Sequence, residues 1–364
     1  MIAPESMSTV RATSASASAP ASPRLAWSGP YLFASEAGQR PYFVYTPTHY
    51  QLGTSVPLVV ILHGCSQTPR GVAVATQWND LAEEHNFIAV YPGQTLAVSP
   101  DAITGPTDAS PGLDYPRGES PGGRLAPCWQ DGNGDNCWNW FLPDHQRRGA
   151  GEPAILAGIT QTVIADAAHW TIDPARVYVA GMSAGGAMAV ILGATYPDLY
   201  SAVAAHSALE YQAATSIPTA FAALAQGGPD PMGQGQQAFQ AMGSHARLMP
   251  VLVVQGTDDL RVNPVNGDQV IQQWLQTNHL ATGGVFTADF ATPTTDTSVN
   301  EVTPAGHLYR VRTWTDSDGK TVHEYWTIEG MGHAWSGGYW LGSFADPRGP
   351  SATRAMYSFF ARSR

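Results

Sequence analysis

The segment at residues 177–197 constrains the fold more than any other part of this chain. Four residues typical of β-strands, Val-Tyr-Val-Ala, run directly into Gly-Met-Ser-Ala-Gly, and a helix-forming segment follows as far as Pro197. A strand that leads through a tight Gly-x-Ser-x-Gly turn into a helix lifts the serine hydroxyl, here Ser183, into the open. Gly181 and Gly185 have no Cβ, so the chain can cross itself closely at this turn. Because the chain has 37 glycines, the bare pattern is weak evidence, and the strand and helix around it carry the prediction.

An acid and a histidine follow Ser183 in the order that a catalytic triad of this kind requires. Residues 249–255 form an apolar run of strand length that ends in Gly-Thr-Asp-Asp, and residues 322–328 alternate like a strand before Glu-Gly-Met-Gly-His. The order Ser183, Asp259, His333 is that of α/β-hydrolases and differs from that of the two common serine-protease folds. In such a triad the imidazole takes the serine proton, and the carboxylate fixes the imidazole tautomer.

An earlier strand leads into a loop that predicts further parts of the site. Residues 57–62 are a continuous apolar run that breaks into His-Gly-Cys-Ser-Gln. In α/β-hydrolases one oxyanion donor is the amide after the nucleophile, here Ala184, and the other comes from such a loop, where we choose Cys65. His63 directly follows the strand, so we expect it to shape the loop by hydrogen bonds rather than to move protons. Gln67 is a candidate substrate contact in the same loop.

Seven ordered motifs point together to one known family. They are Leu-His-Gly-Cys at 62–65, Tyr-Pro at 91–92, Cys-Trp-Asn-Trp-Phe at 137–141, Gln-Arg-Arg-Gly-Ala-Gly-Glu-Pro at 146–153, Asp-Pro-Ala-Arg-Val-Tyr-Val-Ala-Gly-Met-Ser-Ala-Gly-Gly at 173–186, Gly-Thr-Asp-Asp at 256–259 and Gly-His-Ala-Trp at 332–335. In these motifs the chain resembles the poly(3-hydroxybutyrate) depolymerase-type esterases, a family that also contains feruloyl esterases. The resemblance runs from about Arg40 to the C-terminus.

The resemblance implies an α/β-hydrolase fold, with a mostly parallel central sheet flanked by helices, and the triad named above. It also bears on two finer questions. Asp258 is the alternative triad acid, but the family's Gly-Thr-x-Asp-x-x-Val spacing, completed here by Val262, favours Asp259. In the resembling enzymes a tryptophan near the histidine helps to form the substrate surface, which makes Trp335 a candidate substrate contact. Trp138 is a second candidate, with core packing as its alternative role.

The three cysteines allow one disulfide bond. Cys65 and Cys137 both fall in motifs shared with the family, so the resemblance favours a bond between them. A bond between Cys128 and Cys137 is the rival pairing, and free buried thiols are the third possibility. The favoured pairing would tie the predicted oxyanion loop to the Cys-Trp-Asn-Trp-Phe segment.

An irregular insertion, residues 99–136, precedes the Cys-Trp-Asn-Trp-Phe motif. It is rich in Pro, Gly and Asp and has no helical or strand period, which is typical of a functional or disordered loop. Near its end, oxygen-bearing residues are spaced as in calcium loops: Asp131, Asn133 and Asp135. An EF-hand loop would need Gly and Glu where Asn136 and Leu142 stand, so that motif is excluded. A Gly/Asn/Asp turn is favoured over a structural calcium site, and we expect no other metal or cofactor.

Composition and length bound the remaining questions. Residues 1–24, rich in Ala, Ser and Pro, are predicted to be disordered, and residues 25–364 to form one catalytic domain. No apolar signal-peptide core is visible in residues 1–24, although the family and a disulfide favour an extracellular or periplasmic location. The net charge of −11 and the lack of a Lys/Arg cluster exclude a nucleic-acid partner. We expect no membrane span and a monomer or weak oligomer.

These expectations combine into a prediction of function. The resemblance implies a serine carboxylic-ester hydrolase that cleaves hydroxyacyl esters through an acyl-enzyme on Ser183. The main alternative is a feruloyl or acetyl esterase of plant cell-wall esters, because the same framework serves several acyl groups. An acyltransferase is a third possibility, and the intact triad disfavours a non-catalytic binding protein. Residues 350–360 predict a closing helix capped by Ser351 rather than a linker, which favours soluble or amorphous substrates.

Overall fold

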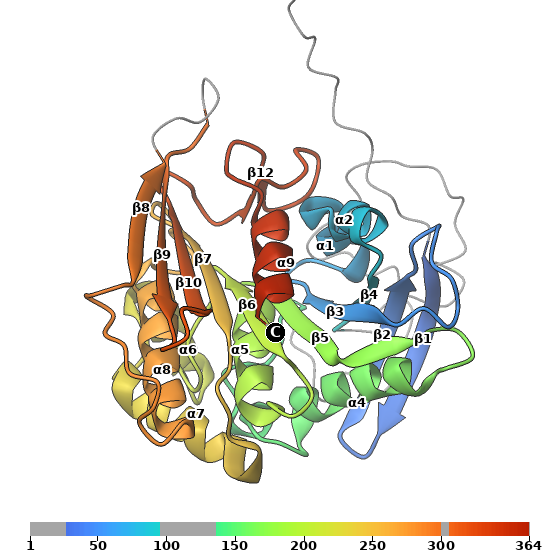
Figure 1. The fold of residues 1–364 in the computed structure, drawn as a ribbon, viewed down its shortest axis with the longest axis horizontal. Helices are drawn as coiled ribbons and strands as arrows, with labels where there is room; N and C mark the ends of the chain where they lie inside the picture. Colours follow the sequence, from blue (N-terminus) through green and yellow to red (C-terminus); the bar gives the residue numbers. More distant parts are fainter. Residues whose placement is uncertain (1–26, 95–135, 300–305, 364) are drawn as a thin grey trace, which may run out of the picture.

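The computed structural model describes residues 27–94, 136–299 and 306–363 of the chain. Its centre is a ten-stranded sheet in the order β1-β2-β4-β3-β5-β6-β7-β10-β9-β8, shown in Figure 1. The strands are β1 (Ser28–Ser35), β2 (Gly38–Tyr45), β3 (Val56–Leu62), β4 (Ile88–Pro92), β5 (Ile172–Met182), β6 (Ala202–His206), β7 (Val251–Gly256), β8 (Thr295–Val299), β9 (Tyr309–Thr315) and β10 (Thr321–Ile328). A separate two-stranded ladder joins β11 (Trp335–Ser336) and β12 (Ala345–Asp346).

The centre of the sheet is parallel and its two edges are antiparallel. Strands β4, β3, β5, β6, β7 and β10 pair in parallel with one another, whereas β1 and β2 on one side and β9 and β8 on the other are joined by antiparallel pairing. Strands β3, β6 and β7 are buried along their whole length, as expected for parallel strands covered on both faces. The apolar runs that predicted strands at 57–62, 249–255 and 322–328 correspond to β3, β7 and β10.

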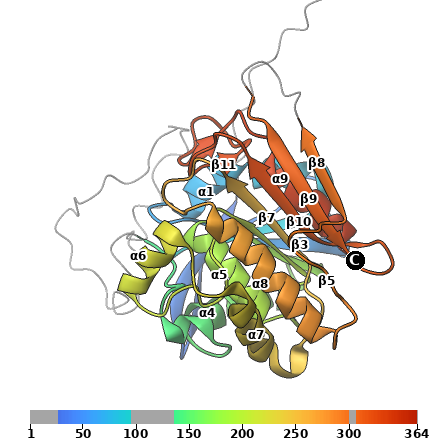
Figure 2. The same cartoon turned by 90° about the vertical axis from the view of Figure 1, so that its left-hand side faces the viewer.

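Helices cover both faces of the sheet. They are α1 (Pro69–Thr76), α2 (Trp78–His85), α4 (Gly151–Ala165), α5 (Ala184–Thr195), α6 (Ile217–Gln226), α7 (Pro231–Met242), α8 (Val265–Ala281) and α9 (Ala352–Arg362), with short 3-10 turns η2 (Pro143–Gln146) and η3 (Gly243–His245). Helices α4, α5, α7 and α8 pack on one face, where Figure 2 shows α7 and α8 side by side. Helices α1, α2 and α9 pack on the other. This is the predicted α/β arrangement of a mostly parallel sheet between two helical layers.

The closing helix begins where the sequence predicts it. Ser351 is the N-cap of α9 and accepts a hydrogen bond from the Arg354 N–H at 3.3 Å. The apolar side of α9 carries Phe359 and Phe360, which are fully buried against the sheet. The predicted disordered segment 1–24 and nearly all of the insertion 99–136 lie outside the described residues.

Strand β5 and helix α5 cross at a distance that leaves no room for a side chain at either glycine of the turn. A Cβ on Gly181 would lie 2.3 Å from the Gly185 carbonyl oxygen. A Cβ on Gly185 would lie 2.3 Å from the carbonyl oxygen of Leu62 and 2.5 Å from that of His63, at the end of β3. The two glycines therefore let α5 begin directly against the ends of both β5 and β3.

This crossing predicts an unequal pair of Gly→Ala variants. Gly185→Ala places a methyl group against backbone, which cannot rotate away, so we expect a loss of about 3 kcal/mol or more in the free energy of unfolding. Gly233→Ala, in exposed α7 with no atom nearer than 3.5 Å to the added Cβ, should instead be neutral or stabilising by ~0.5–1 kcal/mol. Urea unfolding measures both, and equal stabilities would contradict the crossing described here.

Candidate active site

The candidate catalytic residues lie at the carboxyl ends of adjacent parallel strands. Ser183 follows β5, Asp259 follows β7 and His333 follows β10, while the loop that contains Cys65 follows β3. The intervening strand β6 ends in His206. Because parallel strands all have their carboxyl ends at the same end of the sheet, residues far apart in the sequence converge there.

Ser183 lies at the turn between β5 and α5 in a strained backbone conformation. Its φ is 57° and its ψ is −124°, a region that residues with a Cβ rarely occupy. The Ser183 N–H donates to the carbonyl oxygen of His206 at 2.9 Å, which anchors the turn to β6. The half-buried side chain thus sits at the strand-to-helix turn predicted from the sequence.

Asp259 and His333 are in direct contact. The imidazole Nδ1 of His333 donates to Asp259 Oδ2 at 2.8 Å, and Oδ1 accepts the backbone N–H groups of Arg261 and Val262 at 2.9 Å each. Burial acts to raise the pKa of Asp259, but the hydrogen bond from His333 and the two backbone bonds outweigh it, so the pKa is lowered. The carboxylate is therefore ionised at neutral pH and holds the imidazole with Nε2 free of a proton.

The neighbouring acid makes different contacts. Asp258 is exposed, and its carboxylate accepts only a weak 3.4 Å hydrogen bond from the Thr257 hydroxyl among the described residues. Its backbone N–H donates to the Met331 carbonyl, which pins the loop that carries His333. Of the two acids, Asp259 is the one that is hydrogen-bonded to His333.

His206 joins the serine turn to the histidine loop, a role that the sequence analysis missed. Its carbonyl holds Ser183 N–H, and its ring Nε2 accepts the Ser336 N–H at 3.1 Å. Burial, together with the nearby His333, lowers the pKa of His206 to about 3. The ring therefore stays neutral and acts as an acceptor at neutral pH. The signal in the sequence is a short apolar run, residues 202–205, that ends in a histidine.

The serine–histidine hydrogen bond that would complete a catalytic triad is not formed in this structure. Among the described residues, neither Ser183 Oγ nor His333 Nε2 has a hydrogen-bond partner. Catalytic hydrogen bonds often form fully only when substrate is bound, so the two atoms remain free to form such a bond with each other.

The loop after β3 lies against the serine, where an oxyanion would form. A Cβ added at Gly64 would be 3.4 Å from Ser183 Cβ, so the two segments are in contact. Ala184 is the first residue of α5, and its N–H therefore has no partner within the helix. Cys65 is the next residue of the loop and is half-buried. Both candidate oxyanion donors thus flank the serine.

A disulfide bond joins Cys65 to Cys137, 72 residues further along the chain. This is the pairing that the family resemblance favours, and it leaves no cysteine for the rival bond with Cys128, which lies outside the described residues. The oxyanion loop is therefore covalently tied to the segment that begins at Cys137.

That segment is held in turn by a buried carboxylate. Glu152 has no exposed surface and accepts the Asn139 N–H at 2.6 Å and the Arg40 guanidinium at 3.2 Å. Gln94 donates to both Glu152 and the carbonyl oxygen of Cys137. A buried charge is tolerated only with such a full set of partners, so this network fixes the Cys137 end of the disulfide.

His63 is a structural part of the same support, as the sequence analysis expected. It is fully buried, its Nδ1 donates to the Gly64 carbonyl at 2.8 Å, and its Nε2 accepts the Gln94 N–H at 3.2 Å. Burial lowers the pKa of His63 to about 4, so the ring is neutral at neutral pH.

Comparison with known proteins finds esterases that are similar to this chain. A family profile described as "Esterase PHB depolymerase" matches residues 129–296, which include Ser183 and Asp259. Poly(3-hydroxyalkanoate) depolymerase C from Paucimonas lemoignei is 29% identical over 304 residues, which cover 83% of this chain and 60% of that protein. The chain is therefore similar to this esterase family.

A second relative broadens the range of acyl groups represented. Feruloyl esterase B from Neurospora crassa is 28% identical to this chain over 168 residues, covering 46% of this chain and 44% of that protein. The chain therefore spans less than two thirds of the length of either relative. Among solved structures, an acetyl xylan esterase from Aspergillus awamori has a TM-score of 0.62 at 18% identity, over 88% of this chain and 94% of that one. That likeness supports the α/β-hydrolase fold.

The predicted substrate contact at Trp335 is wrong for this chain. Trp335 has no exposed surface, its ring stacks on His206 with centroids 5.1 Å apart, and its indole N–H donates to Thr353 Oγ1 at 3.0 Å. The backbone turns inward after His333, so the ring is buried beneath α9, where its large apolar area is more stable than in water.

The other two predicted substrate contacts are also internal. Trp138 is fully buried and donates its indole N–H to the His63 carbonyl at 3.0 Å, so it packs beneath the oxyanion loop. Gln67 is 1% exposed; its side chain accepts the Gly64 N–H at 2.9 Å and donates to the Ser343 carbonyl at 3.1 Å. Both residues position the loop instead of offering a surface to substrate.

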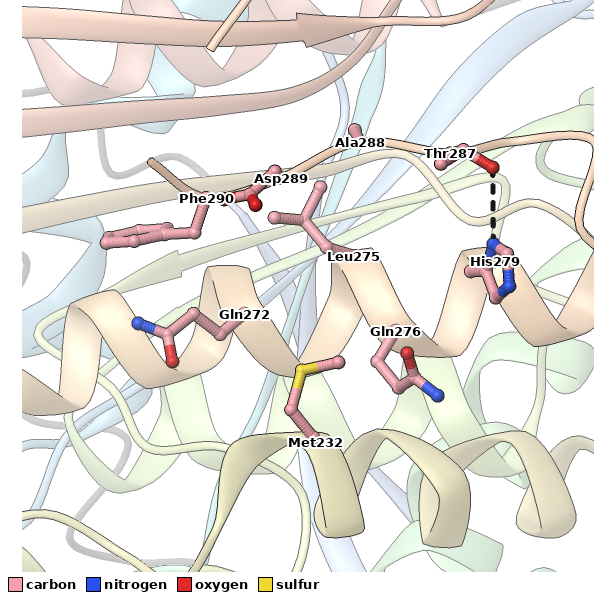
Figure 3. A pocket seen from close by; sticks show the side chains of 9 residues that line it. All are labelled: Met232, Gln272, Leu275, Gln276, His279, Thr287, Ala288, Asp289 and Phe290. Atoms are coloured by element: carbon pink, nitrogen blue, oxygen red, sulfur yellow. Dashed lines mark hydrogen bonds between the residues drawn. The ribbon is translucent and has the colours of Figure 1, made fainter. Parts of the chain in front are cut away.

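An open groove of about 420 Å³ lies elsewhere, between α7, α8 and residues 287–290 (Figure 3). Its α8 residues lie between Gln272 and His279, roughly 10–20 Å along the helix from the end that adjoins Asp259. None of the candidate catalytic residues lines it, so we assign it no part in the site.

The remaining predictions concern metals and membranes. The candidate calcium ligands Asp131, Asn133 and Asp135 lie outside the described residues. Within the described residues, no group of three His, Cys, Asp or Glu side chains is placed to hold a metal ion. In the same part of the chain no helix combines the length and apolar character needed to cross a bilayer.

The disulfide gives a test of how the oxyanion loop is held. Cys137→Ser should lower kcat more than it raises KM, because an unpinned Cys65 amide is no longer fixed before charge develops on the substrate oxygen. Closing a loop of 72 residues stabilises the fold by roughly 4 kcal/mol in the chain-entropy model, so the variant should also unfold at lower temperature.

Cys128→Ser is the matched control and should leave both kcat and the unfolding temperature unchanged. Peptide mapping without reductant identifies the bond directly. A Cys128–Cys137 peptide with an alkylatable Cys65 would overturn the pairing.

Proposed function

We propose that this chain is a serine carboxylic-ester hydrolase that cleaves hydroxyacyl oligoesters through an acyl-enzyme on Ser183. The single observation that carries the proposal is the 2.8 Å contact between His333 and the buried Asp259, at the same end of the sheet as the half-buried Ser183 on its turn. The Paucimonas lemoignei relative, named as a poly(3-hydroxyalkanoate) depolymerase, supports the hydroxyacyl substrate class.

The first half of the reaction follows from the available atoms. His333 Nε2 takes the proton of Ser183 Oγ as that oxygen attacks the ester carbonyl carbon, and Asp259 stabilises the imidazolium that forms. Negative charge develops on the carbonyl oxygen, which accepts hydrogen bonds from the N–H groups of Ala184 and Cys65. When the C–O bond of the ester breaks, the imidazolium returns its proton to the leaving alcohol, and the acyl group remains on Ser183.

The second half repeats these steps with water. Water loses a proton to His333 Nε2 and attacks the acyl carbon, and the tetrahedral intermediate collapses to release a carboxylic acid and to restore the Ser183 hydroxyl. No metal or organic cofactor is needed for either half, since the nucleophile, base and oxyanion donors are all residues of this chain.

A feruloyl or acetyl esterase is the second candidate. The feruloyl esterase B relative favours it, because that alignment shows the same family framework in an enzyme named for a hydroxycinnamoyl ester. The two candidates share the catalytic residues and differ only in the acyl group that the pocket accepts.

The adjacent acids test the proposed triad. Asp259→Asn should lower kcat by about 10⁴-fold, because the amide no longer holds the required imidazole tautomer. Asp258→Asn is the matched control and should retain activity within a few-fold, since its carboxylate is exposed and away from His333. If the two variants exchange their phenotypes, Asp258 is the acid. A fluorophosphonate probe should label Ser183 in the wild type, and labelling of another serine would refute the assignment of the nucleophile.

The substrate class is tested by comparing three esters under one set of conditions: 3-hydroxybutyrate oligomers, a methyl hydroxycinnamate and acetylated xylan. We expect the highest kcat/KM on the hydroxybutyrate oligomers, with Ser183→Ala as the blank for each substrate. Product analysis by chromatography reports which ester bond is cleaved. A kcat/KM about tenfold higher on the hydroxycinnamate or on acetylated xylan would favour the second candidate.

A further inference from the structure

Arg261 holds a positive charge close to the candidate catalytic histidine. It lies two residues after Asp259, and its backbone N–H is one of the two that bind the Asp259 carboxylate. Its guanidinium carbon lies 5.3 Å from the centroid of the Phe344 ring, which in turn meets the His333 imidazole edge-on with centroids 6.1 Å apart. One aromatic ring therefore separates the charge from the candidate catalytic base.

The Phe344 ring, on which the Arg261 guanidinium stacks, is itself fixed in position. Phe344 has a φ of 51°, which a bulky residue adopts only when its surroundings impose it. Its carbonyl oxygen accepts the Trp335 N–H at 2.6 Å, and the preceding residue, Ser343, binds the Gln67 side chain of the oxyanion loop. The segment thus spans from the histidine loop to the oxyanion loop, and the stacked guanidinium is held on the Phe344 ring near His333.

This guanidinium lacks the carboxylate partner that most others in the protein have. Among the described residues, Arg261 is exposed and makes no ion pair or side-chain hydrogen bond. Nine other arginines pair with Asp or Glu: Arg40, Arg147, Arg148, Arg176, Arg310, Arg312, Arg348, Arg354 and Arg362. Arg70 also lacks a partner in the described part of the chain, but no aromatic ring there fixes its position.

The protein as a whole repels anions. Its net charge is −11, so an anionic substrate approaches the site favourably only where a local positive charge offsets that field. A guanidinium stacked by its face still presents N–H groups at its edge, and these match the two oxygens of a carboxylate.

We propose that Arg261 binds a carboxylate on the leaving-group side of the ester, so that the enzyme selects esters that end in a free acid. This rests on the proposed function. In an oligomer of hydroxyacids, the terminal unit carries both the ester oxygen and the free carboxylate. With the carboxylate at Arg261, the adjacent His333 returns its proton to the departing alkoxide oxygen, and a free hydroxyacid is released while the acyl group stays on Ser183.

The test compares two dimers of 3-hydroxybutyrate that contain the same ester bond, one with a free carboxylate and one with that group converted to the neutral carboxamide. The wild type should hydrolyse the acid with a kcat/KM about tenfold above that of the amide, which corresponds to ~1.4 kcal/mol. In Arg261→Gln this ratio should fall to about one, mainly through the KM of the acid, and Arg261→Lys should recover part of it. Added salt should lower the ratio in the wild type.

Arg354→Gln is the matched control, because it removes the same unit of charge from an exposed ion pair on α9. It should keep both the activity and the acid-to-amide ratio of the wild type. An unchanged ratio in Arg261→Gln would overturn the proposal, as would an equal loss of activity on both dimers, which would show that Arg261 only supports the loop.

A binding measurement separates this proposal from the proposed function. Calorimetry of 3-hydroxybutyrate with Ser183→Ala and with Ser183→Ala/Arg261→Gln needs no turnover, and we expect about tenfold weaker binding to the double variant. Equal affinities would overturn the carboxylate site whatever ester the enzyme cleaves. If Arg261 governs binding but neither dimer is hydrolysed by the wild type, the hydroxyacyl function fails and the carboxylate site stands.

Discussion

The close crossing of β5 and α5 over the end of β3 is the constraint on which the candidate site depends. Two glycines bring three backbone segments together at distances that exclude a Cβ, and this contact forces Ser183 into its strained turn. The same approach places the oxyanion loop beside the serine. Strain at one residue is sustained because the packed sheet and helix around it outweigh its cost.

Around this crossing, the site is assembled from supports that come from distant parts of the chain. A disulfide and the buried Glu152 network hold the oxyanion loop on one side, and neutral His206 joins the serine turn to the histidine loop on the other. Such preorganised donors and acceptors lower the barrier most when they need not rearrange during the reaction. Much of the buried polar structure therefore serves to position a few exposed atoms.

The loop that contains Asp259 has two roles at the candidate site. The Asp259 loop supplies both the carboxylate that holds His333 and the Arg261 guanidinium that stacks on Phe344. One short loop thereby orients the base and places a charge for substrate selection. The positive charge of Arg261 favours a soluble substrate with a free carboxylate over the neutral surface of a polymer.

The sequence by itself predicted the central strands, the serine turn and the candidate triad, and it favoured the Cys65–Cys137 pair over two alternatives, because each depends on a local pattern or on a motif shared with the family. Only the tertiary structure decided that Trp335 turns inward, that His206 bridges two loops and that Arg261 has no carboxylate partner in the described part of the chain. These outcomes depend on contacts between segments far apart in the chain. A side chain's local sequence sets its chemistry, but its neighbours across the sheet decide whether it packs, supports or meets a substrate.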